Sequence, residues 1–220
     1  AYWKRYTPGD LYIRIIISRG FGDIGFDPSL CPRATTLIIV KKFVPLAGSM
    51  YRKGIDLALV PTIRNNPKSI DPNIKSGNYL NNILAYLEAK KAKAYDALMQ
   101  NYKGEITEGT NSNVFMVKNG ALMTPAIESG LLRGLTRTLV IDTAKQAQIA
   151  VHETTISRED LFSADECFVS SSLKGILPVR SCNAQKIGSG KPGPVTIELM
   201  KKFNQSVKNA LKEEYCIDIS

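Results

Sequence analysis

The pattern of hydrophobic residues changes once along this chain. Two runs rich in β-branched residues, 11–18 and 35–40, predict strands separated by a loop that several glycines punctuate. Beyond them, short hydrophobic runs alternate with helical patterns. The segment 43–49 contains proline and glycine and indicates a connection between domains. We therefore expect two domains, at 1–42 and 50–220.

The second part predicts three long helices, at 78–93, 135–148 and 194–215, each with apolar residues recurring every three or four positions. Asn119-Gly120 predicts a hairpin turn, because both residues tolerate positive φ. Ser157 predicts the cap of a short helical turn. The strand-like runs of this part are 56–63, 97–102, 113–118, 121–125, 149–153 and 166–171.

Composition limits the class of protein. The chain has 220 residues, of which 44% are hydrophobic and 22% charged, as in an ordinary globular protein with a substantial core. No apolar run approaches the roughly 20 residues that span a bilayer, and the first residues lack the apolar core of a signal peptide. The net charge of +9 is spread along the chain rather than gathered into one basic stripe. We expect neither a nucleic-acid partner nor a membrane partner.

The cysteine and histidine content points away from metal binding. The four cysteines are scattered, with no CxxC pair and no histidine cluster beside them. The single histidine, His152, lies in a strand-like run and is interpreted as a structural or surface residue. We expect reduced thiols, a cytoplasmic protein and no metal site.

Three segments carry candidate chemistry. The first, 71–82, places Lys75 just before a helix, from where its amine can reach a cavity as a Schiff-base lysine must. The second, 104–115, contains two glutamates among small and polar residues. The third, 130–137, begins a helix after a glycine, and a helix start supplies N–H groups to an anion.

In that order and at those separations, the three segments resemble the class IV aminotransferases, which use pyridoxal 5′-phosphate (PLP). The resemblance runs through nearly the whole chain. It implies a two-domain α/β protein of fold type IV, with a mixed sheet and a pseudo-barrel in the large domain. Residues 1–42 would be the C-terminal part of the small domain, and 50–220 the large PLP-binding domain. The family's active site lies between the domains, usually in a homodimer whose partner contributes a loop.

The resemblance implies a role for individual residues. Lys75 would form the Schiff base with PLP, whereas the nearby Lys68 matches no position of the family. Glu108 would face the pyridine nitrogen and keep it protonated, with Glu105 as its near rival. The other cofactor contacts implied are Tyr79 near the phenolic oxygen, Leu132 over the ring, Leu135 and Thr136 at the phosphate, and Ser171 and Ser172 beside it.

Substrate recognition rests on fewer residues. Tyr12 and Arg14 align with positions that line the substrate pocket of branched-chain aminotransferases, and Arg14 could receive the side-chain carboxylate of glutamate. The family usually reads Gly-Thr-Ala where this chain has Ser171-Ser172-Leu173. Leu173 therefore adds bulk beside the expected position of the substrate carboxylate.

Several activities share this fold. The segment 78–82, together with Tyr12 and Arg14, favours the branched-chain type, which exchanges an L-amino acid with a 2-oxo acid such as 2-oxoglutarate. The segment 172–179 resembles aminodeoxychorismate lyases. D-Amino-acid aminotransferases typically carry an Arg-x-His pair that this chain lacks. An inactive scaffold is the alternative outside enzymology, and the presence of Lys75 and Glu108 argues against it.

The resemblance also implies a segment that this sequence does not show. The family has about 80 further small-domain residues before the first strand, including an arginine that clamps the PLP phosphate. The sequence begins at Ala1 with no matching arginine. We expect the N-terminal part of the small domain to be missing from it.

Overall fold

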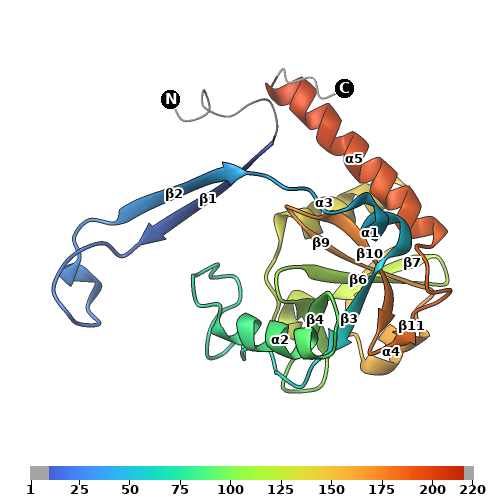
Figure 1. Ribbon diagram of the computed structural model, residues 1–220, viewed down its shortest axis with the longest axis horizontal. Helices are drawn as coiled ribbons and strands as arrows, with labels where there is room; N and C mark the ends of the chain where they lie inside the picture. Colours follow the sequence, from blue (N-terminus) through green and yellow to red (C-terminus); the bar gives the residue numbers. More distant parts are fainter. Residues whose placement is uncertain (1–9, 216–220) are drawn as a thin grey trace. The chain divides into compact units, whose positions relative to one another are not determined.

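The computed structural model describes residues 10–215 (Figure 1). The chain divides after Pro45 into two compact units, of which the first ends there and the second begins at Leu46. Unit 1 and unit 2 each have their own architecture. Among the described residues, no helix is long and apolar enough to cross a membrane.

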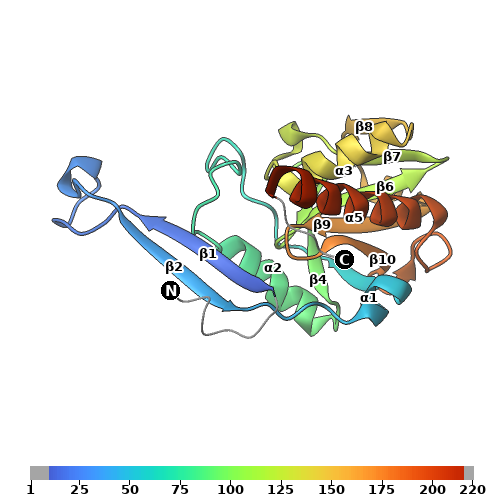
Figure 2. The same cartoon turned by 90° about the horizontal axis from the view of Figure 1, so that it is seen from above.

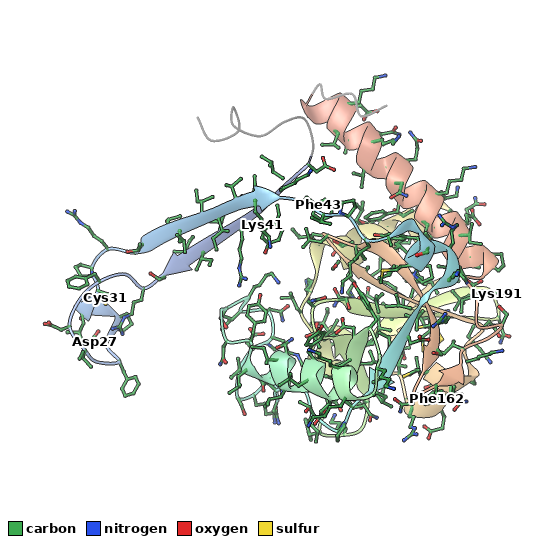
Figure 3. The ribbon with its side chains drawn as sticks, viewed as in Figure 1. Asp27, Cys31, Lys41, Phe43, Phe162 and Lys191 are labelled. Atoms are coloured by element: carbon green, nitrogen blue, oxygen red, sulfur yellow. The ribbon has the colours of Figure 1, made fainter. Side chains whose placement is uncertain are left out.

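Unit 1 is a β-hairpin. Strand β1 (Leu11–Ser18) pairs antiparallel with β2 (Thr35–Lys42) along their whole lengths, so both predicted strands are confirmed. The connecting loop contains a short 3₁₀ turn, Pro28–Leu30, which begins where the Asp27 carboxylate accepts the N–H of Ser29. Side chains stand out from both faces of the ribbon (Figure 3). The isoleucines of β1 at 13, 15 and 17 are each more than half exposed.

Unit 2 is built on one nine-stranded mixed sheet among the described residues. Strand β9 pairs with both β10 and β6, and β10 continues through β3, β4 and β5 back to β6. These six strands therefore close into a barrel, and the implied α/β fold with a pseudo-barrel is confirmed. The strands are β3 Ile55–Leu59, β4 Asp96–Gln100, β5 Ile106–Gly109, β6 Asn113–Lys118, β7 Ala121–Pro125, β8 Val151–Thr154, β9 Glu166–Ser171, β10 Gly175–Cys182 and β11 Gln185–Lys186.

Side chains point alternately to the two faces of each strand, so hydrophobic residues form one core inside the barrel and another outside it. One set of side chains fills the barrel, and includes Leu57, Leu98, Val114, Val169 and Leu177. The opposite faces of β6 and β9 carry Phe115 and Phe168, whose rings stack with centroids 4.9 Å apart under two helices. These helices are α3 (Leu135–Gln146) and α5 (Pro194–Tyr215), which lie side by side (Figure 2).

Helix α2 (Leu80–Lys91) packs on the barrel with an unexpected face. The sequence pattern predicts its apolar face at Leu80, Ile83, Leu84 and Leu87, yet these side chains are 47–64% exposed. Ala85 and Ala89 are buried instead, against Ala58 on β3 and Ala97 on β4. Small residues on both sides let the helix backbone approach the strands closely. The helix is confirmed, but the pattern does not predict which face the barrel covers.

Strand β2 extends two residues beyond the predicted run 35–40, and three predicted strands of unit 2 have different bounds. The run 56–63 gives only Ile55–Leu59, because Pro61 has no N–H to donate to a neighbouring strand. The run 97–102 becomes Asp96–Gln100, since the chain turns where the Gly104 N–H donates to the Asn101 carbonyl. The run 149–153 becomes Val151–Thr154, with His152 exposed on it. The predicted hairpin at Asn119-Gly120 is confirmed, with positive φ at both residues.

The cap of helix α4 (Arg158–Ser163) gives a stability prediction. Ser157 Oγ accepts the N–H of Asp160 at 3.0 Å, and the Asp160 carboxylate accepts the N–H of Ser157 at 2.8 Å. We expect Ser157→Ala to lower the free energy of unfolding by about 1 kcal/mol, since one helix-start N–H loses its partner. Urea unfolding would measure this loss, with exposed Thr155→Ala as the control. Equal stabilities for the two variants would contradict the assigned cap.

Candidate active site

A cavity of about 260 Å³ opens at one end of the barrel, within unit 2. It lies where β5 turns into β6 and where β9 ends, and the loops before α2 and α3 complete its wall. The three segments singled out in the sequence converge here. The cavity wall includes Lys75, Tyr79, Glu108, Leu132, Leu135, Thr136, Ser171 and Ser172.

The loop that carries Lys75 is tied down by its own polar groups. The Asp71 carboxylate accepts the N–H of Asn73 at 2.9 Å, and the Asp71 carbonyl accepts the N–H of Ile74 at 3.0 Å. The Asn73 side-chain oxygen accepts the N–H of Arg133 at 3.1 Å, which joins this loop to the one before α3. These hydrogen bonds hold the backbone beside Lys75 in a fixed position. Lys68, by contrast, is not part of the cavity wall.

Glu108 is held in the cavity wall by two donors. One carboxylate oxygen accepts Arg64 Nε at 2.8 Å, and the other accepts the N–H of Leu132 at 3.1 Å. Glu108 is only 6% exposed, and burial raises the pKa of its carboxyl above the usual value. The charge of Arg64, the Leu132 N–H and the charge of Lys75 oppose that rise in pKa.

The rival carboxylate lies elsewhere. Glu105 accepts Asn101 Nδ2 at 2.6 Å and is not among the residues of the cavity wall. Arg64, by contrast, is in the wall and was missed from the sequence. A buried carboxylate calls for a cationic partner, but the sequence does not say which of its many cations supplies it. Arg64 and Glu108 are 44 positions apart in the chain, so their contact arises only from the tertiary structure.

Helix α3 begins at the cavity with its first N–H groups free of a side-chain cap. Gly134 is the capping residue and has extended backbone, with φ −69° and ψ 138°. The hydroxyls of Thr136 and Ser172 lie 3.4 Å apart at this end of the helix. An uncapped helix start beside two hydroxyls can bind a phosphate through N–H and O–H donors and through the helix dipole.

Two further hydroxyls in the cavity wall have no hydrogen-bond partner among the described residues. Ser112 Oγ and Ser170 Oγ are buried without a hydrogen bond in the described part of the chain. Buried polar atoms are normally satisfied, so these hydroxyls suit a ligand that brings acceptors. An amine, a buried carboxylate, an uncapped helix start and spare hydroxyls match the aldehyde, pyridine nitrogen and phosphate of PLP. The residues of this cavity therefore fit that cofactor.

Gly134 has no room for a side chain. A Cβ at this position would lie 2.3 Å from the side-chain oxygen of Asn113. The Asn113 side chain is itself held in place, because its Nδ2 donates to the Leu132 carbonyl at 2.9 Å. We expect Gly134→Ala to displace the start of α3, weaken PLP binding at least about 10-fold and lower the free energy of unfolding by about 1–3 kcal/mol. A fluorescence titration with PLP and urea unfolding would measure the two effects.

Gly77→Ala is the matched control, because a Cβ there meets nothing within 4 Å. Unchanged PLP affinity in Gly134→Ala would show that the helix start does not hold the phosphate.

The three predicted substrate residues belong to different units, Leu173 to unit 2 and Tyr12 and Arg14 to unit 1. Leu173 is 50% exposed and follows three serines of the cavity wall, but does not itself line the cavity. Tyr12 and Arg14 belong to β1 of unit 1, where the Lys41 ammonium lies 5.0 Å from the centre of the Tyr12 ring. The roles of these three residues stay predictions. No group of three or more His, Cys, Asp or Glu side chains among the described residues could hold a metal ion.

Comparison with known proteins identifies the family and agrees with the fold. The family model of class IV amino-transferases matches residues 2–182, and the chain belongs to that family. Within the family, it is similar to branched-chain aminotransferases. A putative branched-chain-amino-acid aminotransferase of Methanocaldococcus jannaschii is 38% identical over 195 residues, covering 88% of this chain and 66% of the relative. The branched-chain-amino-acid aminotransferase of Escherichia coli K12 is 35% identical over 196 residues, covering 87% of this chain and 63% of the relative.

Solved structures show the same relationship. The Escherichia coli branched-chain amino acid aminotransferase superposes with a TM-score of 0.85 at 34% identity, over 89% of this chain and 65% of that one. The branched-chain aminotransferase of Thermoproteus uzoniensis with norvaline superposes with a TM-score of 0.83 at 30% identity, over 93% and 67%. Another branched-chain enzyme, solved with pyridoxamine 5′-phosphate, has a TM-score of 0.86 at 29% identity. The sequence spans slightly less than two thirds of the length of the curated relatives, at 63–66%.

Proposed function

We propose that this protein is a PLP-dependent transaminase that exchanges an L-amino acid of branched-chain type with a 2-oxo acid such as 2-oxoglutarate. The observation that carries the proposal is one cavity lined by Lys75, Glu108 and the uncapped start of α3. The names of the similar proteins support the choice of substrate class.

PLP, when bound, supplies an electron sink for the charge that develops at the substrate Cα. Lys75 is proposed to hold the cofactor aldehyde and then, once freed, to carry the α-proton as base and acid. Glu108, kept in place by Arg64 and the Leu132 N–H, is proposed to hold the pyridine nitrogen protonated. The α3 start, Thr136 and Ser172 are proposed to bind the phosphate.

Leu132, Leu135 and Tyr79 complete the proposed cofactor site. Leu132 lines the cavity, and its backbone N–H also donates to the Glu108 carboxylate. We propose that its side chain covers one face of the ring and that Tyr79 lies near the phenolic oxygen. Apolar cover excludes water and strengthens the electrostatic contacts of the charged groups beside it.

The remaining parts of the proposal concern the whole protein. We propose that 1–42 is the C-terminal part of the small domain, that 43–49 connects the domains and that 50–220 is the PLP-binding domain. Tyr12, Arg14 and Leu173 are proposed to contact substrate. We further propose a homodimer or a higher homo-oligomer in the cytoplasm.

The test is a spectroscopic one. The intact polypeptide loaded with PLP is mixed separately with L-leucine, L-glutamate, D-alanine and aminodeoxychorismate while its absorbance is recorded. Conversion to the pyridoxamine form by both L-leucine and L-glutamate is expected. A response to D-alanine alone would replace the proposal by a D-amino-acid aminotransferase, and pyruvate release from aminodeoxychorismate would replace it by a lyase. Failure to form the Schiff-base absorbance at all would support an inactive scaffold.

A further inference from the structure

A buried lysine lies directly behind one wall of the cavity. The Lys174 side chain is 11% exposed, and its ammonium lies 3.5 Å from an oxygen of the buried Asp96 carboxylate. The same ammonium donates to Asn111 Oδ1 at 2.5 Å, between residues 63 positions apart. It also lies 5.4 Å from the centre of the Tyr95 ring. Lys174 itself does not belong to the cavity wall, whereas Asn111 does.

Hydrogen bonds from several elements hold the residues around Lys174 in place. The Thr110 hydroxyl donates to the other oxygen of Asp96 at 2.5 Å, and the Thr110 carbonyl accepts Asn82 Nδ2 at 2.7 Å. The Lys174 carbonyl accepts the Tyr51 hydroxyl at 3.0 Å. The β5–β6 turn and the turn after β9 are thus held together at the point where Asn111 meets Lys174.

The chemistry of the contact decides which way the Asn111 amide is turned. An ammonium has three donors and no acceptor, so the atom that meets Lys174 must be the amide oxygen. The amide NH₂ is therefore the branch turned away from the lysine. It has no hydrogen-bond partner among the residues that the structure describes. A cation on the amide oxygen also polarises the group and strengthens its N–H donors.

We propose that Asn111 is a substrate-contacting residue whose NH₂ donates to a carboxylate of the amino acid or oxo acid, and that Lys174 is the positioning residue that turns it. This inference rests on the proposed function, since every substrate of that reaction carries a carboxylate. The donor is held before substrate arrives, so binding does not have to order it. The PLP phosphate is proposed to bind at the start of α3, so the Asn111 amide remains available for the substrate carboxylate.

The binding test uses 4-methylvalerate, a branched-chain carboxylate without an amino group, and its uncharged counterpart 4-methylpentan-1-ol. Calorimetry gives the affinity of the PLP-loaded protein for each. Asn111→Ala is expected to weaken 4-methylvalerate about 10-fold or more, as for loss of a hydrogen bond to a charged group, and to leave the alcohol unchanged. Asn111→Asp is expected to weaken it further, because a like charge replaces the donor. Asn204→Ala, on the exposed side of α5, is the control for removal of an amide.

Lys174 has its own readout. Lys174→Met is expected to raise KM for L-leucine about 5-fold or more with kcat nearly kept, and Lys174→Arg is expected to recover most of that loss, because it restores a buried cationic donor. Thermal unfolding shows whether each variant is folded, and Asn111→Asp, which can pair with the lysine, covers the case in which Lys174→Met does not fold.

Unchanged 4-methylvalerate affinity in both Asn111 variants would overturn the contact, and equal kinetics for Lys174→Met and the unaltered protein would overturn the positioning role. Equal weakening of acid and alcohol would also overturn the contact, since it would show a change of cavity shape. Failure of the proposed function is separate, because it shows as no cofactor conversion by L-leucine in the unaltered protein.

Discussion

Lys75→Ala is expected to abolish turnover, lowering the rate of the half-reaction with L-leucine by at least about 10⁴-fold. The substitution removes the only amine that the proposed chemistry uses both to hold the cofactor and to carry the α-proton. PLP binding is expected to weaken but persist, since Glu108 and the α3 start remain in the cavity wall. Absorbance of the PLP-loaded variant, followed after addition of L-leucine, measures both properties.

Lys68→Ala is the matched control, because Lys68 lies seven positions earlier in the chain and outside the cavity wall. It is expected to react at the rate of the unaltered protein. Retention of substantial activity by Lys75→Ala would remove Lys75 from the mechanism, whatever the behaviour of the control.

Glu108→Gln is expected to lower the rate roughly 10²–10³-fold, the usual cost of losing one well-placed electrostatic group in an active site. The amide keeps the shape of the side chain and can still accept Arg64 Nε, but it has no charge to hold the pyridine nitrogen protonated. PLP should still bind, so the defect should appear in the rate and not in occupancy. Rapid-mixing absorbance with L-leucine measures the rate, and Glu105→Gln is the control outside the cavity wall.

The same substitution has a consequence for stability against pH. Because burial raises the folded-state pKa of Glu108 above its usual value of 4.5, the folded protein holds this proton more tightly than the unfolded chain. The protonated Glu108 carboxyl therefore contributes fully to the free energy of unfolding below about pH 4.5, and this contribution is lost as the pH rises through the folded-state pKa. Urea unfolding of the cofactor-free protein should show this loss, and Glu108→Gln should lack it. Identical pH slopes for the two proteins would show that Glu108 is not desolvated in solution.

Local signals were strong enough to predict most of the elements. Hydrophobic periodicity predicts α2, α3 and α5 to within two residues, because a regular helix needs only its own neighbours along the chain. Turn chemistry predicts the hairpin at Asn119-Gly120 and the cap at Ser157, since both depend on residues in contact through the local backbone. Strand ends were less well predicted where proline or a turn interrupts the pairing.

The burial of α2 shows where local reasoning ends. Its leucines and isoleucine resemble a core face, yet the barrel covers the alanines instead, which are buried in one cluster with Ala58 and Ala97. The partner strands are set by pairing between distant segments, which the helix sequence does not contain.

The sequence by itself determined most of the elements, the family resemblance and the three segments whose residues carry the proposed chemistry, but not β5 and β10 of the barrel. Only the tertiary structure decided that these segments share one cavity, that Arg64 and not another cation pairs with Glu108, and that Lys174 lies against Asn111. The physical reason is the closure of the barrel by β9 between β6 and β10. Closure brings together the ends of strands far apart in the chain, and the sequence pattern of a single strand carries no information on which ends will meet.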